Sequence, residues 1–282
     1  MKYANLHLHS THSDAGFRPA FLARMAKSLG YGALALTDHE TFSGVPELLE
    51  SAKSLGLEAM TGIELVGRDG ERRPHIVGLD FDMEHPAIVT LANRVAKSAT
   101  EGVRIRFEDM MERGCFEKTI TWEEFVDCCP RTDFLCADHI FYVLDLKGIA
   151  PLSDHRNTRA AFKACTKEVP RTERGTAKET IDAIRAAGGI AILAHAREEF
   201  FDSGFVDTLI GYGLNGIEVS HPNMTERAMK LAVHTAMEHR LYCSGGTDHT
   251  GPMSSCDDPY AIPAYQGATK DEFYAMKERR FG

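Results

Sequence analysis

The chain has no apolar run near the ~18 residues that a membrane-spanning helix needs. Its first residues, M-K-Y-A-N-L-H, lack the long apolar core of a secretion signal, so we expect a cytoplasmic protein. The sequence also has no C-x-x-C pair, which argues against a zinc finger and predicts reduced, mostly buried thiols instead of a disulfide framework. The seven cysteines are Cys115, Cys128, Cys129, Cys136, Cys165, Cys243 and Cys256.

Acidic residues outnumber basic ones: the chain has 41 Asp and Glu but only 32 Lys and Arg, and its formal net charge is −9. A sequence-independent grip on long nucleic acid needs a basic surface, so long nucleic acid is not an expected partner. A small phosphorylated substrate remains compatible with this charge, because bound metal ions reverse the local field. With 282 residues, the chain has room for one large α/β domain or for a domain carrying an insertion. Nothing in the sequence specifies an oligomeric state.

Short apolar runs alternate with amphipathic stretches near both ends of the chain. The apolar runs predict strands at residues 3–8, 33–37, 58–65, 75–81, 190–194, 216–219 and 241–244. The amphipathic stretches predict helices at residues 19–29, 46–55, 176–187 and 225–239. Such an order favours a parallel sheet or a β/α barrel.

The middle of the chain is mostly helical in pattern. Helices are predicted at residues 86–113, 122–128, 134–146 and 155–166. We therefore expect a barrel built from residues 1–82 and 176–282, with residues 83–175 inserted as a mainly helical cap over the site.

Several predicted strands end in histidine or carboxylate instead of ordinary turn residues. These side chains are ligands of Zn, Mn and Fe, and the chemistry of a β/α barrel gathers at the carboxyl ends of its strands. The candidate ligands are His7, His9, Asp14, His39, Glu64, His75, His195, Asp248 and His249. The pattern predicts a metal-dependent hydrolase.

Each candidate also has an ordinary structural interpretation. His7 and His9 point to the same face of a strand, where they can bind one ion or simply meet solvent. Asp14 fits a turn before Gly16, and His195 fits a hydrogen-bonded core histidine. Asp38 is expected to orient a ligand beside it. Together the candidates lie at corresponding ends of successive strands, which favours the metal site.

These residues lie in a series of motifs that spans residues 5 to 251. The motifs are L-H-L-H-S-x-H-S-D, L-T-D-H, G-I-E-L, H-I-V-G-L-D-F-D, G-G-I-A-I-L-A-H, G-I-E-V and G-G-T-D-H-T-G. In content and order, the series resembles the PHP (polymerase and histidinol phosphatase) family of the amidohydrolase-like superfamily. The resemblance implies a distorted (β/α)7 TIM-like barrel that holds two or three divalent ions, Mn, Zn or Fe.

The resemblance also implies a distribution of the ligands among the ions. One ion would take His7, His9, Glu64 and Asp248. A second would share Glu64 and take His75 and His195. A third would take Asp14, His39 and His249.

Three departures from the family pattern concern the outer part of the site. His249 follows Asp248 directly, whereas the family usually has one residue between them, so the third ion is the least secure. Ala196 replaces the proline of the usual A-H-P. The cap has Cys136-Ala137-Asp138-His139 where relatives often carry an arginine shortly before the histidine.

The expected reaction is hydrolysis of a phosphate ester by a metal-bridging hydroxide. Asp248, His249 and His221 are the candidates for supplying a proton to the leaving group. Arg18, His139 and Arg197 are the candidate phosphate contacts, since arginine binds phosphate oxygens in pairs.

The expected substrate is a small nucleotide or sugar phosphate, as a monoester or a cyclic diester, because a cap favours a small ligand. Three alternatives stay open. The first is a 5′-exonuclease of short oligonucleotides. The second is a non-catalytic PHP module of the kind attached to polymerases. The third is an amidohydrolase that acts on C–N bonds.

Overall fold

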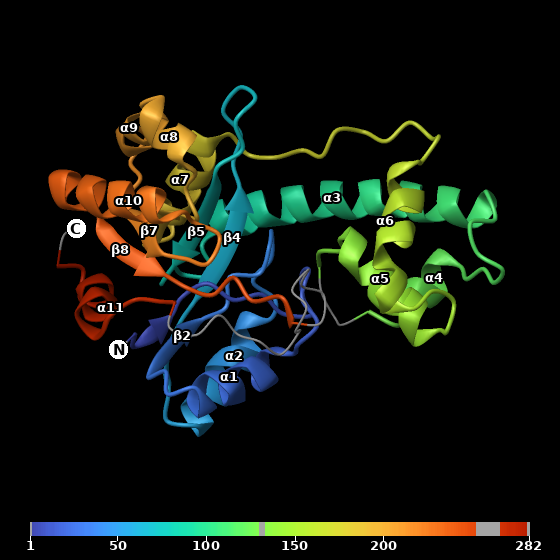
Figure 1. The fold of residues 1–282 in the computed structure, drawn as a ribbon, viewed down its shortest axis with the longest axis horizontal. Helices are drawn as coiled ribbons and strands as arrows, with labels where there is room; N and C mark the ends of the chain where they lie inside the picture. Colours follow the sequence, from blue (N-terminus) through green and yellow to red (C-terminus); the bar gives the residue numbers. More distant parts are fainter. Residues whose placement is uncertain (1, 130–132, 252–265, 281–282) are drawn as a thin grey trace.

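A computed structural model describes residues 2–129, 133–251 and 266–280, so Cys256 lies outside the described residues. The six cysteines within them are free thiols. Among the described helices, none combines the length and the apolar character that crossing a bilayer requires. Helices and strands alternate along most of the chain, and the fold is mixed α/β (Figure 1).

The N-terminal part forms a small parallel sheet. Its strands are β1 (Ala4–Asn5), β2 (Ala33–Ala35) and β3 (Glu58–Met60), in that order. They are connected by α1 (Pro19–Ser28) and α2 (Val45–Ser54), each of which has a proline in its first turn. The glycines that follow these helices, Gly30 and Gly56, have positive φ angles of 83° and 66°, as expected where a helix ends in the left-handed conformation.

The second sheet has five strands. These are β4 (Gly62–Val66), β5 (His75–Leu79), β6 (Ile190–Leu193), β7 (Gly216–Ser220) and β8 (Tyr242–Gly245), also in that order. The neighbours β6, β7 and β8 are parallel, but β5 is antiparallel to both β4 and β6. A wholly parallel sheet was therefore the wrong expectation for β5. β4 and β5 are joined by a short connection without a helix. Consecutive strands joined in this way pair antiparallel, because a parallel pair needs a longer crossover connection, usually a helix.

One expected strand, residues 58–65, is divided between the two sheets. β3 pairs with β2, and β4 pairs with β5. The break falls at Gly62, where a Cβ atom would lie only 2.2 Å from the carbonyl oxygen of Leu36. Only glycine allows the chain to cross so close to the neighbouring backbone.

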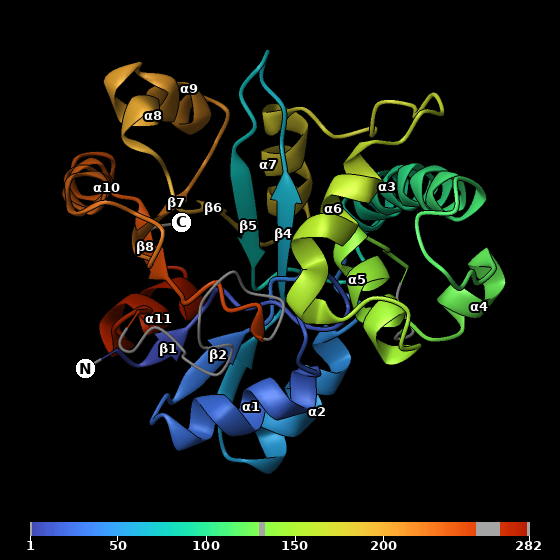
Figure 2. The ribbon, with the colours of Figure 1, turned by 45° about the vertical axis from the view of Figure 1, so that its right-hand side comes forward.

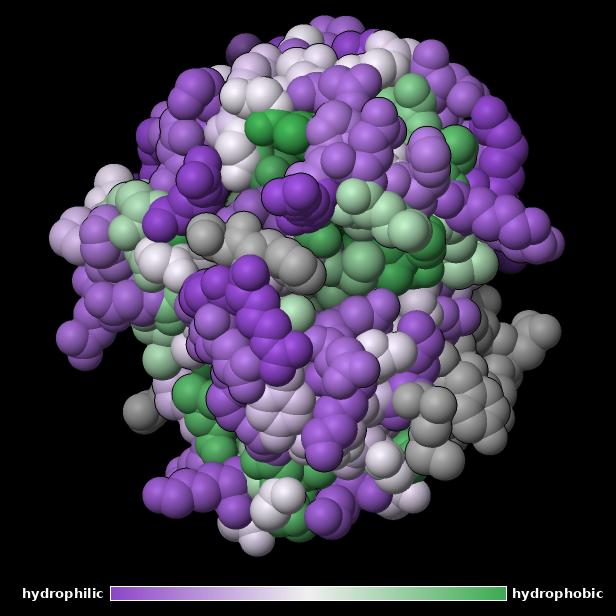
Figure 3. Space-filling view, turned by 90° about the vertical axis from the view of Figure 1, so that its left-hand side faces the viewer, coloured by the Kyte–Doolittle hydropathy of each residue, from purple (hydrophilic) through white to green (hydrophobic). Residues whose placement is uncertain are grey.

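Helices pack on the five-stranded sheet in the C-terminal half of the chain (Figure 2). They are α7 (Ala177–Ala186), α8 (Glu198–Asp202), α9 (Phe205–Gly211), α10 (Glu226–His239) and α11 (Lys270–Lys277). Thr176 caps α7 by accepting a hydrogen bond of 3.0 Å from the backbone N–H of Glu179. Figure 3 shows the end of the molecule opposite α4, where hydrophilic residues cover most of the surface.

The helical middle of the chain consists of α3 (Pro86–Glu112), α4 (Trp122–Val126), α5 (Ala137–Leu146), a short 3₁₀ helix η1 (Leu152–Asp154) and α6 (His155–Lys163). The first half of α3 buries Ile88 and Leu91 in the core that contains β4, β6 and α7. Its second half buries Phe107 and Met110 in a separate cluster with α4 and α5. One helix therefore belongs to two hydrophobic cores.

Isolated pairs of residues join the two sheets at the point where the candidate ligands lie. Leu8 pairs with His249, and His39 pairs with Glu64, each in parallel. The described strands form two sheets, and their hydrogen-bonding order does not confirm a closed seven-stranded barrel.

Candidate metal centre

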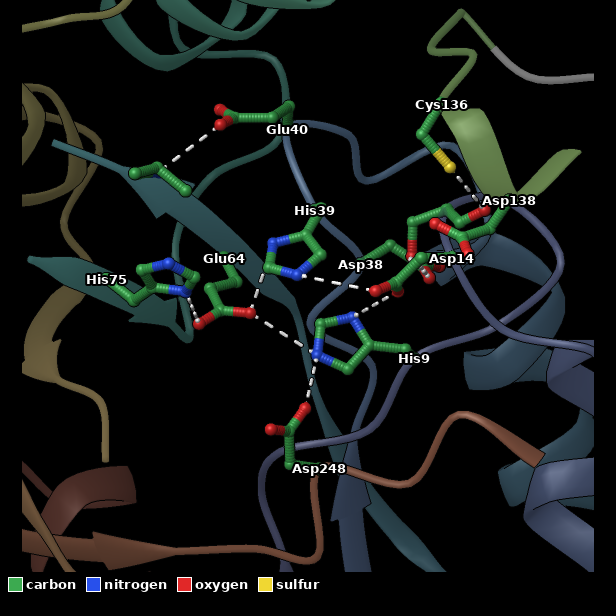
Figure 4. Close-up of polar contacts among 12 residues, drawn as sticks. His9, Asp14, Asp38, His39, Glu40, Glu64, His75, Cys136, Asp138 and Asp248 are labelled. Atoms are coloured by element: carbon green, nitrogen blue, oxygen red, sulfur yellow. Dashed lines mark hydrogen bonds and ion pairs between the residues drawn. The ribbon is translucent and has the colours of Figure 1, made fainter. Parts of the chain in front are cut away.

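Glu64 lies at the centre of the site. Its side chain is buried on β4 (Figure 4). Its Oε1 lies 2.7 Å from Nδ1 of His75 and 3.1 Å from Nε2 of His195. Its Oε2 lies 3.2 to 3.3 Å from three further imidazoles, which belong to His7, His9 and His39. One buried carboxylate thus faces five imidazoles that come from four parts of the chain.

Two further carboxylates flank His9 on opposite sides (Figure 4). Its Nε2 lies 3.0 Å from Oδ1 of Asp248, and its Nδ1 lies 3.5 Å from Oδ1 of Asp14. Asp14 also lies 3.7 Å from Nε2 of His39. An imidazole with one ring proton can donate to only one of these carboxylates, so a second proton or a cation between the groups favours the arrangement. This arrangement fits a site for more than one cation.

The described residues contain five triplets whose ligand atoms lie within 4.8 Å of one another. The triplets are His7–His195–Asp248, His7–Glu218–His221, His7–His9–Glu64, His9–Asp14–His39 and His39–Glu64–His75. Because imidazole nitrogens and carboxylate oxygens are the ligands of Zn, Mn and Fe, the donor set fits divalent metal ions.

The charges in the site also favour cations. Burial raises the pKa of Glu64, but His39 and His7 outweigh this effect and hold it well below its usual range. Burial lowers the pKa of His7, whereas Glu218 and Glu64 raise it well above its usual value. The ionised form of Glu64 and the protonated form of His7 therefore stabilise each other. Bound metal ions would take over that balancing charge.

Glu218 is a member of the site that the sequence analysis did not identify. It lies on β7, buried, with Oε1 2.8 Å from Nδ1 of His7. Its Oε2 accepts a 2.6 Å hydrogen bond from the backbone N–H of His195. The signal was present in G-I-E-V, where a carboxylate interrupts an apolar strand as Glu64 does in G-I-E-L.

The backbone is constrained at two candidate ligands. His195 and Asp248 have φ angles of 30° and 50°, which are uncommon for residues other than glycine. The first is held by Glu218, and the second by a 2.9 Å hydrogen bond from its backbone N–H to the carbonyl of His7. Such local strain persists where the surrounding structure fixes a functional geometry.

Asp38 organises the loop that carries Asp14. Its buried carboxylate accepts hydrogen bonds of 2.6 Å from the Ser10 backbone N–H, 2.7 Å from the Ser10 hydroxyl and 2.5 Å from the Ser13 hydroxyl. The expected orienting role of Asp38 therefore acts on this loop, which ends at Asp14.

The structure gathers eight of the nine predicted ligands around one centre. The exception is His249, which belongs to none of the five triplets. Its ring lies near Phe17, with 5.8 Å between the ring centroids, and burial lowers its pKa. Asp248 has a left-handed backbone conformation, with a φ angle of 50°, and the next residue, His249, belongs to none of the ligand triplets.

The candidate proton donor His221 joins the site and is fully buried. Its Nε2 lies 3.5 Å from Oδ2 of Asp248. Its Nδ1 accepts a 3.1 Å hydrogen bond from the backbone N–H of Asn223, which leaves the ring proton on Nε2.

The candidate phosphate contacts lie farther out. Arg18 and Arg197 are exposed and pair with Glu47 and Glu199, respectively. His139 is buried, and burial lowers its pKa to about 4, so its ring is neutral. Its Nδ1 accepts from the backbone N–H of Cys136 at 3.1 Å, and its Nε2 donates to the carbonyl of Thr11 at 3.3 Å.

Comparison with known proteins agrees with this site. Residues 5–113 match the PHP domain model. A 5′-3′ exoribonuclease of Haemophilus influenzae is 29% identical over 89% of this chain and 91% of its own length. A 3′,5′-nucleoside bisphosphate phosphatase of Chromobacterium violaceum is 28% identical, over 89% of this chain and 88% of its length. A phosphoribosyl 1,2-cyclic phosphate 1,2-diphosphodiesterase of Eggerthella lenta is 26% identical, over 88% and 94%.

Two solved structures share the fold. One is a protein of Bifidobacterium adolescentis, provisionally described as a metal-dependent phosphoesterase. Its TM-score is 0.79 and its sequence identity 22%, and the match covers 99% of this chain and 96% of that one. The other is an amidohydrolase of Chromobacterium violaceum with bound sulfate and no metal, with a TM-score of 0.75, 21% identity and coverage of 98% and 96%. At these identities the likeness shows the fold alone.

Residues 5–113 thus match the PHP domain, in agreement with the family that the sequence motifs resemble.

Proposed function

We propose that this protein is a metal-dependent phosphoesterase that hydrolyses a small phosphorylated metabolite, a nucleotide or sugar phosphate in monoester or cyclic diester form. The observation that carries the proposal is the buried Glu64 carboxylate surrounded by five imidazoles and flanked by Asp14 and Asp248. The three relatives named above support it, because each name describes an enzyme that breaks a phosphate ester.

The proposed ligands divide into overlapping sets. His7, His9, Glu64 and Asp248 would hold one ion, and Glu64, His75 and His195 a second. For a third ion, the geometry leaves Asp14 and His39, whose ligand atoms lie 3.7 Å apart, whereas His249 belongs to none of the triplets. Mn, Zn or Fe bound here would lower the pKa of water and offset the charge of the phosphate.

The residues of the chain supply the remaining functions. Glu218 holds His7 and His195 in place. His221 directs its ring proton toward Asp248, which makes this pair the preferred proton source for the leaving alkoxide. His249 is the weaker candidate because its ring lies against Phe17.

The proposed architecture is a distorted (β/α)7 barrel, formed by residues 1–82 and 176–282, with residues 83–175 as its cap. The pairs Leu8–His249 and His39–Glu64, which connect the two sheets, support this arrangement. The separate hydrophobic cluster of the helical middle supports the cap.

The test is hydrolysis of a panel of substrates by protein loaded with Mn²⁺, measured as phosphate release from monoesters and as formation of the ring-opened monoester from cyclic diesters. The panel contains nucleoside bisphosphates, cyclic ribose phosphates, histidinol phosphate and an aryl phosphate. We expect hydrolysis of at least one small substrate, loss of hydrolysis with a chelator, and loss in His9→Ala. The matched control is His234→Ala, because His234 is an exposed histidine on α10 far from these contacts. Full activity of chelated protein, or of His9→Ala, would refute the proposal.

A second candidate is a 5′-exonuclease of short oligonucleotides. It is favoured by the 29% identity to the exoribonuclease of Haemophilus influenzae across nearly the whole chain. Short RNA in the same panel separates the two candidates. Release of mononucleotides from RNA, without turnover of any small phosphate ester, would favour the exonuclease.

A further inference from the structure

Glu40 follows the candidate ligand His39, and its side chain is buried and points away from the imidazole cluster (Figure 4). Just before it, His39 pairs with Glu64 in a parallel bridge. The backbone N–H of Glu64 donates to the carbonyl of Asp38 at 3.1 Å, and the backbone N–H of Glu40 donates to the carbonyl of Glu64 at 2.8 Å. The segment that carries His39 therefore holds the backbone of Glu64 through two hydrogen bonds.

The carboxylate of Glu40 continues this pairing where the backbone does not. In a parallel ladder, the next donor along β4 is the backbone N–H of Val66, and its acceptor would be the carbonyl of Glu40. Glu40 has a φ angle of 58°, and Val66 donates instead to Oε1 of the Glu40 side chain at 3.3 Å. A charged group thus takes the place of a backbone acceptor beside the metal centre.

Arg174 balances this buried charge. The Glu40 side chain is only 4% exposed, and Nη1 of Arg174 donates to its Oε1 at 2.7 Å. Among the described residues, Arg174 is the only one that forms an ion pair with Glu40, and the Oε2 atom of Glu40 is buried without a hydrogen-bond partner. A buried carboxylate that loses its counterion is strongly destabilising, so the arrangement depends on Arg174.

The segment that carries Arg174 is fixed on both of its sides. It comprises residues 164–176, which connect α6 with α7. The backbone N–H of Glu173 donates to the hydroxyl of Ser98 on α3 at 2.7 Å, and Thr176 pairs with Arg68 in the connection between β4 and β5. Arg174 therefore reaches Glu40 from a segment that is anchored to α3 and to the end of β4.

We propose that Arg174 and Glu40 are positioning residues of the metal centre, which together keep His39 and Glu64 in the arrangement that binds the ions. The inference rests on the proposed function, because that function requires the metal centre. Neither side chain has to contact metal or substrate. Without the Arg174 charge, the Glu40 carboxylate is buried and unbalanced, which favours its release from Val66 and loosens the pairing of His39 with Glu64.

The test is calorimetric titration of the metal-free protein with Mn²⁺ or Zn²⁺. Arg174→Gln should weaken the binding of at least one ion by about tenfold or more, the usual effect of losing a group that supports metal ligands. Adding Glu40→Gln to this variant should restore most of the affinity, because the amide oxygen can still accept from Val66 and needs no counterion. Arg174→Lys should bind metal nearly as the wild type does, because the contact uses a single nitrogen.

Arg104→Gln is the matched control, because Arg104 forms an exposed ion pair of 2.8 Å with Glu108 on α3. It should keep the wild-type affinity. Unchanged affinity in Arg174→Gln overturns the proposal. A double variant that folds but binds as weakly as Arg174→Gln also overturns it, because Arg174 would then act only by anchoring its own segment.

Circular dichroism of each metal-free variant shows whether it folds. If Arg174→Gln does not fold, the double variant decides: folding with wild-type affinity supports the proposal, and failure to fold or to bind overturns it. A wild type that binds metal but hydrolyses no ester overturns the proposed function and leaves the positioning role in place. A wild type that binds no metal overturns both.

Discussion

Replacing Glu218 by glutamine tests how the protein prepares its histidines for metal. Glutamine matches the shape of the carboxylate but has only one acceptor oxygen. In the wild type, Oε1 faces Nδ1 of His7 at 2.8 Å and Oε2 faces the backbone N–H of His195 at 2.6 Å. The backbone N–H of His195 cannot change, so the amide oxygen must serve it.

The amide NH₂ of the variant must then face His7. It forces Nδ1 of His7 to accept a hydrogen bond, which moves the ring proton to Nε2. That atom lies 3.3 Å from Glu64 and 3.2 Å from Nε2 of His9, where a metal ligand must be unprotonated. If His7 keeps its tautomer, a buried donor is left unpaired at a cost of about 1–3 kcal/mol.

Either outcome weakens metal binding by roughly 10- to 100-fold, the usual effect of losing such a supporting carboxylate. Calorimetric titration of the metal-free protein with Mn²⁺ or Zn²⁺ measures it directly. Glu226→Gln is the control, because Glu226 is an exposed glutamate on α10. Unchanged metal affinity and stoichiometry in Glu218→Gln would refute this account of the site.

Three further changes test other parts of the structure. Gly246→Ala should destabilise the fold by about 3 kcal/mol or more in chemical denaturation, because its Cβ would lie 2.4 Å from the backbone nitrogen of His7, whereas Gly211→Ala has open space and should be nearly neutral. Asp38→Asn should weaken metal binding at Asp14 without unfolding the protein, because it removes charge from the acceptor of the Ser10 and Ser13 hydrogen bonds. Glu58→Gln should lower stability by about 1–2 kcal/mol at pH 7, because Lys277, Tyr274 and Tyr3 all donate to this carboxylate.

The Glu58 prediction includes a pH dependence. Burial raises the pKa of Glu58, but its three donors outweigh burial and lower it to about 2. Its stabilising effect is therefore complete above the unfolded pKa of about 4.3 and is lost as the pH falls toward 2. Denaturation curves of wild type and Glu58→Gln should converge over that range. The Glu58 prediction is wrong if the two curves stay equally far apart at pH 2. The Gly246 prediction is wrong if Gly246→Ala has the stability of the wild type, and the Asp38 prediction is wrong if Asp38→Asn keeps the wild-type metal affinity.

The sequence predicted eight of the residues that gather at one centre, from polar side chains within or just after apolar strands, where an unpaired charge is costly. The same argument applied equally to Glu218, whose carboxylate interrupts G-I-E-V as Glu64 interrupts G-I-E-L, but it was not extended to that residue. His249 was expected to hold the third ion because the family resemblance implied it, but its ring lies near Phe17 and it belongs to none of the five triplets.

The sheet topology was harder to predict than its strands. The run at residues 58–65 is continuous in hydrophobicity, and its division between two sheets depends on the close backbone contact at Gly62, which is a tertiary feature. α8 and α9 are short helices of 5 and 7 residues, and their pattern is too brief to be distinguished from a loop. The hydrogen bond between His139 and the carbonyl of Thr11 likewise joins segments that are distant in the sequence.

The position of α3 has a consequence for the mechanics of the whole molecule. Its 27 residues run without interruption from the core beneath β4 to the separate hydrophobic core of the helical middle. The helical middle cannot rotate about this connection unless a continuous helix breaks, and removal of residues 83–175 would remove Ile88 and Leu91 from the other core. The two cores should therefore unfold as a single cooperative unit, and substrate must enter by small local movements of the connecting loops, not by the swing of a hinged lid.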